Sequence, residues 1–238
     1  METIMEPDWR VFPDRESLLK AALEIVRQCE AGSGSNFSVV LAGGQTPLDL
    51  YRMLAGEAMQ WDKWRVYFGD ERCLPPDHAD RNSLQAALAF LDCVPIPPGQ
   101  IFVPPAELGP AEAASCYGEQ LKNAGKFDLV LLGLGEDGHT ASLFPGHDLG
   151  AGQGAMDVLP VFDAPKPPPE RISLSAQRLS RARTVLFLVT GEAKREAVMR
   201  WQQGRPIPAS RIGAGESLVV LADQAACPNR MTTKGDQE

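Results

Sequence analysis

Short apolar runs alternate along the chain with longer segments in which apolar residues recur every three or four positions. The short runs are bounded by turn residues, as buried strands are, and the longer segments have the period of helices with one apolar face. This alternation predicts an α/β fold with three α/β/α layers, in which a mostly parallel, Rossmann-like sheet lies between helices. The expected strands are residues 9–12, 38–41, 65–68, 127–132, 158–162, 171–174, 184–189 and 217–221, and the expected helices are about 15–29, 47–54, 83–91, 111–123 and 192–201.

The same pattern favours one domain over two. Residues 146–169 are rich in glycine and proline and predict a surface loop. A domain boundary in this loop would leave an incomplete sheet on each side. We therefore assign residues 1–226 to a single domain and expect residues 227–238 to form a flexible polar tail.

Composition and charge narrow the class of protein. Hydrophobic residues make up 44% and charged residues 23%, as in ordinary globular chains. The net charge of -8 gives no electrostatic basis for binding nucleic acid, and an anionic ligand would need a locally positive site. The chain has no apolar run of about eighteen residues, and its start is acidic where an export signal is basic. We expect a cytoplasmic protein that binds neither nucleic acid nor membranes.

Cysteine and histidine spacing gives no sign of a metal site. The five cysteines form no CxxC or CxxH pair, which is typical of reduced thiols in a cytoplasmic protein. Zinc takes three or four protein ligands, so the Asp-x-His of residues 137–139 alone is a poor metal site. The chain also has neither a GxSxG elbow nor a reactive-cysteine signature. The sequence predicts no metal, no cofactor and no covalent nucleophile.

The first candidate segment is LAGGQTP, between an expected strand and an expected helix. Gly43 and Gly44 would let the backbone approach a ligand closely, and Thr46 lies at the start of a helix whose free N–H groups attract anions. The segment could bind a phosphate, or it could be a tight turn only. It is neither a Walker loop nor a GxGxxG fingerprint.

The second candidate segment is YFGDERCLPP, which places Asp70, Glu71 and Arg72 directly after an expected strand. Charged residues in this position either solvate a loop or line a site at the carboxyl edge of the sheet. The planar guanidinium of Arg72 could bind a phosphate.

The third candidate segment is GLGEDGHTASLFPG, in which Asp137 and His139 are two residues apart. Histidine is the usual general base for activating water, and a neighbouring carboxylate can orient it. The alternative is a solvated loop histidine, which is our interpretation of His78 and His147. GLGEDG matches GxGxxG in letters, but its surroundings do not favour a dinucleotide. Ser142 lies in a helix-like context and is expected to cap or pack.

At these three segments the chain resembles the 6-phosphogluconolactonase family, within the superfamily that includes glucosamine-6-phosphate deaminase and ribose-5-phosphate isomerase. LAGGQTPLDLY is similar to the family's SGGxTP loop, with Ala42 in place of serine, and FDLVLLGLGEDGHTASLFPG matches its most specific motif. FGDERCLPPDHADRNS resembles the GDER segment, with the order of Asn82 and Ser83 exchanged. The PPxxR strand, the GxxK helix start and a PAS segment follow, so the resemblance covers about residues 39–221.

The resemblance implies a cofactor-independent enzyme of the oxidative pentose phosphate pathway that hydrolyses 6-phosphogluconolactone, as a monomer or weak homodimer. It implies His139 as the base and Asp137 as its partner. The expected substrate and phosphate contacts are Gly43, Gly44, Thr46, Asp70, Arg72, Arg171 and Lys194.

Two alternatives stay open. An amino-sugar-phosphate deaminase or isomerase would share the glycine loop and the DGH turn, but it needs a further acid or base. The deaminases resemble DGHxAxNEPG, with a glutamate at the position of Phe144 in this chain. A noncatalytic sugar-phosphate sensor is the other alternative, although the chain has no room for an added DNA-binding domain.

Overall fold

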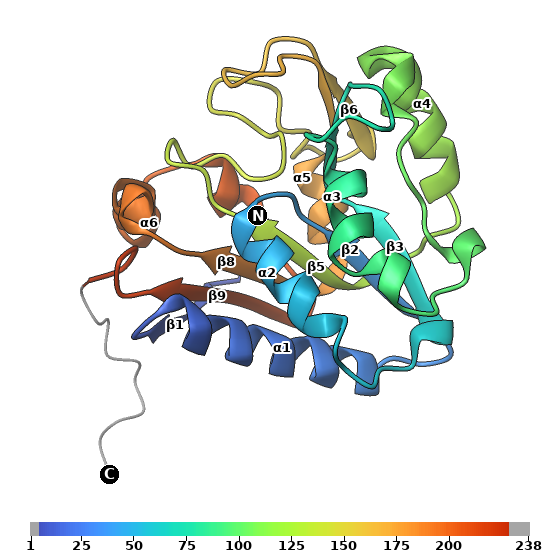
Figure 1. The fold of residues 1–238 in the computed structure, drawn as a ribbon. Coiled ribbons are helices and arrows are strands. Elements are labelled where there is room, and N and C mark those ends of the chain that lie inside the picture. Colours follow the sequence, from blue (N-terminus) through green and yellow to red (C-terminus); the bar gives the residue numbers. More distant parts are fainter. Residues whose placement is uncertain (1–4, 229–238) are drawn as a thin grey trace.

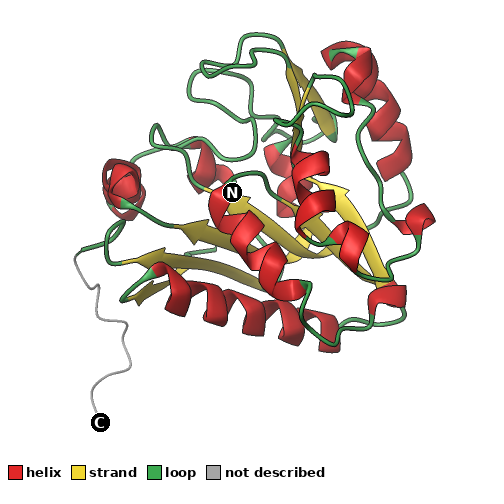
Figure 2. Cartoon of the chain, viewed as in Figure 1, coloured by secondary structure: helices red, strands yellow, loops and turns green. Residues whose placement is uncertain are grey.

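Six parallel strands form the centre of the structure, a computed structural model that describes residues 5–228. Their order is β1-β9-β8-β5-β2-β3, and every neighbouring pair is parallel. Helices lie on both sides of this sheet (Figures 1 and 2), which confirms the predicted three layers. The strands are β1 (Asp8–Phe12), β2 (Phe37–Leu41), β3 (Trp64–Phe68), β5 (Phe127–Gly133), β8 (Ala182–Val189) and β9 (Ser217–Asp223).

The helices divide between two cores, one on each face of the sheet. The first face is covered by α1 (Arg15–Ala31), α2 (Gln45–Leu54) and α3 (Asn82–Ala89), and the second by α4 (Pro110–Leu121), α5 (Ala176–Ser180) and α6 (Arg195–Gln202). No helix within residues 5–228 is long and apolar enough to cross a membrane. Short 3₁₀ turns occur at Trp61–Lys63, Leu91–Cys93, Pro98–Gln100, Ala106–Leu108, Glu192–Lys194 and Pro208–Arg211.

Alternation within a strand explains why both faces are buried. In β2, Phe37, Val39 and Leu41 contribute to the core under α1, whereas Val40 contributes to the opposite core. Side chains of a strand point alternately to the two faces, so a strand with apolar residues directed to both faces needs helices on both sides. This is the physical basis of the predicted layers.

Asp14 caps the start of α1. The Asp14 side chain accepts a hydrogen bond of 2.8 Å from the backbone N–H of Ser17, and this bond is the main cause of a lowered pKa for Asp14. Leu18, Ala22 and Ile25 of this helix face the core. The cap satisfies one of the free N–H groups of the first turn and fixes where the helix begins.

A second sheet was not predicted. It has three antiparallel strands in the order β4-β7-β6: β4 (Asp70–Arg72), β7 (Arg171–Leu174) and β6 (Val158–Val161). The GDER segment is therefore a short strand and not a loop, because it pairs with residues about one hundred positions later. The pairing places Arg72 directly opposite Arg171.

Smaller differences concern element ends. The helix expected at 192–201 is a 3₁₀ turn followed by α6, and α3 starts at Asn82 and ends at Ala89. Ser142 is not in a helix: it lies in a tight turn closed by a bridge between Thr140 and Leu143. Cys227 is buried, so the ordered chain continues past the expected domain end, and residues 229–238 of the predicted tail lie outside the described residues.

The order of the strands identifies where a ligand would bind. From β2 the chain continues outward to β3, whereas β5 lies on the other side of β2 and leads toward β8 and β9. The connections therefore diverge between β2 and β5. In open parallel sheets this switch point creates a crevice at the carboxyl edge.

Candidate active site

A cavity of about 500 Å³ lies at this carboxyl edge. The segments that follow β2, β3, β5 and β8 all contribute to its wall, together with the start of α1, the segment 166–167 and the start of β7. Nearly all of the site residues predicted from the sequence line it: Gly43, Gly44, Thr46, Asp70, Arg72, His139, Arg171 and Lys194. Asp137 does not line the cavity and lies behind His139, to which it is bonded.

The glycine loop leads directly into α2. Gly44 has a φ of 104°, a conformation that favours glycine, and it caps α2 without a side-chain hydrogen bond. A Cβ atom on Gly43 would lie 2.2 Å from Oδ1 of Asn82, so only glycine fits there. The Thr46 and Thr190 hydroxyls are 2.7 Å apart and join the loops after β2 and β8. The start of α2 thus presents backbone N–H groups at the cavity.

His139 and Asp137 form a bonded pair at the end of β5. Nδ1 of His139 is 2.5 Å from Oδ1 of Asp137, and the backbone N–H of His139 donates to the same oxygen at 3.0 Å. Partial burial acts to raise the pKa of Asp137, but these bonds from His139 outweigh burial and lower it. With Nδ1 held by Asp137, the other ring nitrogen, Nε2, is the one available to a ligand in the cavity.

Gly135 shapes the space that the imidazole ring occupies. A Cβ atom at Gly135 would lie 2.0 Å from Nδ1 of His139, whereas one at Gly133 would meet nothing within 4 Å. Gly135→Ala should therefore displace the ring and lower kcat at least tenfold, while Gly133→Ala, in the same cavity wall, should leave kcat within about twofold. Steady-state kinetics of both variants test this, and equal effects would argue against a role for ring position.

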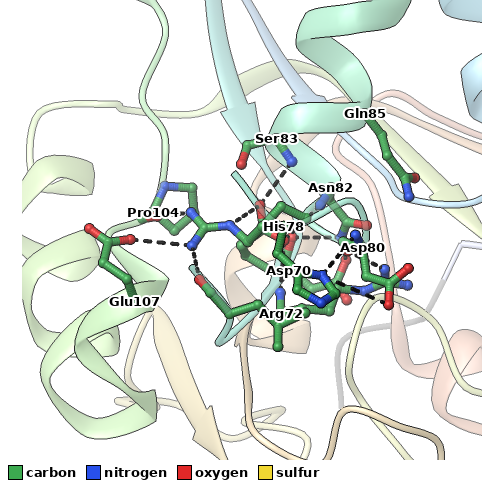
Figure 3. Close-up of polar contacts among 12 residues, drawn as sticks. Asp70, Arg72, His78, Asp80, Asn82, Ser83, Gln85, Pro104 and Glu107 are labelled. Carbon is green, nitrogen blue, oxygen red and sulfur yellow. Dashed lines mark hydrogen bonds and ion pairs between the residues drawn. The ribbon is translucent and has the colours of Figure 1, made fainter. Parts of the chain in front are cut away.

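Asp70 and Arg72 are held by a network of polar contacts after β3 (Figure 3). Asp70 is buried and accepts bonds from the Ser142 hydroxyl at 2.6 Å and the Asn82 side-chain amide at 3.1 Å. Ser142 therefore packs and bonds, as expected, though not in a helix. Nη1 of Arg72 donates to the backbone carbonyl of Asp80 at 2.6 Å, while its Nε is buried without a hydrogen bond.

Glu71 has a structural position and does not line the cavity. It is fully buried and accepts backbone N–H bonds of 2.8 Å from Asn82 and Ser83, and its Oε2 lies 3.3 Å from Nε of Arg81. A buried carboxylate with these partners fixes the start of α3.

We expect Glu71→Gln to lower the free energy of unfolding by about 1–3 kcal/mol, because the charge partner of buried Arg81 is removed. Urea unfolding measures the change. Glu107→Gln is the matched control, since Glu107 also pairs with Arg81 but its side chain is 38% exposed. A larger loss in the control than in Glu71→Gln would contradict this assignment.

The family profile described as glucosamine-6-phosphate isomerases/6-phosphogluconolactonase matches residues 13–221. The chain belongs to this family. The 6-phosphogluconolactonase of Mycobacterium leprae is 35% identical to it, over 93% of this chain and 98% of the relative. The human 6-phosphogluconolactonase is 37% identical over 85% of both chains. The crystal structure of 6-phosphogluconolactonase from Thermotoga maritima superposes with a TM-score of 0.84, at 27% identity, over 92% of this chain and 100% of that chain.

Two basic residues of this family member line the cavity but were missed by the sequence analysis, Arg15 and Lys166. Arg15 is in the first turn of α1, and its Nη2 lies 2.5 Å from Oδ2 of Asp49 in α2. Nothing in the local pattern distinguishes Arg15 from other exposed helix residues. Lys166 lies in the proline-rich loop, where an isolated lysine reads as a solvated side chain.

The wall of the cavity is strongly positive. Among the described residues that line it, Asp70 is the only carboxylate. Burial lowers the pKa of Lys194, and the nearby Lys166 contributes in the same direction, against the opposing effect of Glu136. The chain as a whole has a net charge of -8, but the wall of this cavity is positive and can therefore attract an anion. The basic residues are Arg15, Arg72, Lys166, Arg171 and Lys194.

No group of three histidine, cysteine or carboxylate side chains within residues 5–228 is arranged to hold a metal ion. The five cysteines also lie within residues 5–228, where they are dispersed over the fold and form no disulfide.

Proposed function

We propose that this chain hydrolyses 6-phospho-D-glucono-1,5-lactone to 6-phospho-D-gluconate, in the oxidative pentose phosphate pathway. The observation that carries the proposal is the His139–Asp137 pair beside the same positive cavity that contains the glycine loop. One group can activate water while the others hold an anion. The 6-phosphogluconolactonases that match most of the chain support this choice of substrate.

The phosphate is bound at the start of α2. The Gly43–Gly44 turn and Thr46 offer backbone and hydroxyl donors, and Lys194 and Arg72 supply positive charge. Binding the remote phosphate orients the lactone ring, so binding energy lowers the barrier of a step at another part of the molecule.

His139 acts as base and then as acid. Nε2 accepts a proton from a water molecule as the water oxygen attacks the lactone carbonyl carbon. The tetrahedral intermediate then breaks the bond between this carbon and the ring oxygen, and His139 returns the proton to that oxygen. Asp137 keeps Nδ1 as the donor nitrogen and stabilises the protonated ring. One water is added, and the acid product ionises.

The environment of Phe144 favours hydrolysis over deamination. Phe144 is buried, with its ring centroid 4.9 Å from that of His139. An apolar ring cannot transfer the additional proton that opening and isomerising an amino sugar require. Lactone hydrolysis needs no such group.

A substrate panel tests the proposal. We expect hydrolysis of freshly prepared 6-phosphogluconolactone, unchanged in the presence of EDTA, and no ammonia release from glucosamine 6-phosphate. Ammonia release at a rate equal to or above lactone hydrolysis would identify the deaminase alternative, and binding of both sugars without turnover would identify a sensor. We further propose that the enzyme works in the cytoplasm as a monomer or weak homodimer, without nucleic acid.

A further inference from the structure

Lys166 reaches the cavity from the proline-rich loop 162–170, in which it is the only basic residue. Its side chain is 53% exposed, and its Nζ lies 3.9 Å from Oε1 of Glu136. This is a loose ion pair at the surface, which contributes little to stability. The ammonium group is therefore free to exchange Glu136 for a ligand in the cavity.

The backbone of this loop is held by Arg171. The guanidinium donates three hydrogen bonds to three successive carbonyls, from Nη2 to Lys166 at 2.8 Å and to Pro167 at 3.2 Å, and from Nε to Pro168 at 3.0 Å. Arg171 is itself fixed, because it is buried in β7 and lies over the Phe144 ring at 5.6 Å. The planar fork of an arginine can hold several carbonyls at once, which a lysine cannot.

These bonds change the role expected for Arg171. Two of its three nitrogens are already used by the loop, so its main contacts are not with a substrate. Lys166, in contrast, lies close enough to Lys194 to help lower the pKa of that lysine, after the larger effect of burial. Two ammonium groups that repel each other at one cavity wall are stabilised when a dianion binds between them.

We propose that Lys166 binds the phosphate of the substrate together with Lys194, and that Arg171 is the residue that positions Lys166. The proposal rests on the proposed function for the nature of the phosphorylated substrate. It assigns a binding role to the loop 162–170, and it replaces direct substrate contact by Arg171 with a positioning role.

The first test measures binding of 6-phosphogluconate and of unphosphorylated gluconate by titration calorimetry. Lys166→Met should weaken the binding of 6-phosphogluconate by about tenfold or more, as expected for the loss of one charge-assisted bond. The affinity for gluconate should stay unchanged. Lys122→Met is the matched control, because Lys122 is an exposed lysine on the far end of α4 that does not line the cavity. Unchanged 6-phosphogluconate affinity in Lys166→Met would overturn the proposal.

The second test is a double-mutant cycle with Arg171→Lys, which keeps the charge but cannot hold three carbonyls. Arg171→Lys alone should weaken the binding of 6-phosphogluconate by about three- to tenfold. In the Lys166→Met background the same substitution should have almost no further effect on this affinity. A merely structural arginine would give the same fold-change in both backgrounds, and this result would overturn the positioning role. Thermal midpoints identify any variant that is not folded.

Failure of this proposal differs from failure of the proposed function. If the wild-type protein hydrolyses the lactone while Lys166→Met binds 6-phosphogluconate normally, only the role of Lys166 is wrong. If the wild-type protein does not hydrolyse the lactone, the proposed function is wrong. The comparison of 6-phosphogluconate with gluconate in the titration still decides the role of Lys166.

Discussion

Replacement of His139 by asparagine is expected to lower kcat by about two to four orders of magnitude, the usual contribution of a positioned general base. Asparagine keeps polarity and approximate size, but it cannot accept and return a proton. KM should change little, because the proposed phosphate contacts come from the start of α2, from β4, from the 3₁₀ turn Glu192–Lys194 and from the loop 162–170, and not from the loop after β5. Initial rates over a range of pH measure the effect.

His147→Asn is the matched control for this variant. His147 also packs against Phe144, with ring centroids 5.8 Å apart, but it does not line the cavity. Its replacement should leave kcat within about twofold. If His139→Asn kept near-normal turnover and the wild-type pH profile, the base would have to be Asp70 or Asp137.

Removing Lys194 and Arg72 is expected to reduce use of the phosphorylated lactone specifically. A charge-assisted hydrogen bond contributes about 1.5–3 kcal/mol, so each alanine variant should lower kcat/KM for 6-phosphogluconolactone by about ten- to hundredfold. The rate with unphosphorylated glucono-1,5-lactone should change far less. Lys122→Ala provides a control for loss of a lysine outside the cavity.

The ratio of the two rates decides between binding and structural roles. Arg72 is part of the network after β3, because it donates to the carbonyl of Asp80. A purely structural contribution would lower both rates equally. If Lys194→Ala lowered the rates with the two lactones equally, Lys194 would not be a phosphate contact.

The layers of the fold could be predicted from the sequence because they depend on local periodicity. The runs at 38–41 and 127–132 are apolar apart from Ser38 and Asp128, and their apolar residues occupy both alternating sets of positions, so burial on both faces was expected. The small sheet could not be predicted in this way. The strand Asp70–Arg72 is three residues long and largely polar, and only its pairing with Arg171–Leu174 makes it a strand. Pairing between strands that are far apart in the sequence is not visible in the local pattern of apolar and polar residues.

The candidate site was predictable to the extent that its residues follow strands. Parallel strands end at one edge, so the segments after 41, 68, 132 and 189 had to meet there. Arg15 and Lys166 reach the cavity from a helix and a loop outside these segments, and no local signal identified them. Arg171 was identified, but the loop carbonyls that occupy its donors become visible only in three dimensions.

The most direct test of the account is the decay of freshly prepared 6-phosphogluconolactone, followed by quenching at short intervals because the lactone also hydrolyses spontaneously. The wild-type protein should accelerate this decay far above the protein-free rate, and His139→Asn should lower the acceleration by about two to four orders of magnitude. Acceleration should be much weaker with glucono-1,5-lactone. A wild-type rate equal to the spontaneous rate, or equal rates for wild type and His139→Asn, would contradict the account.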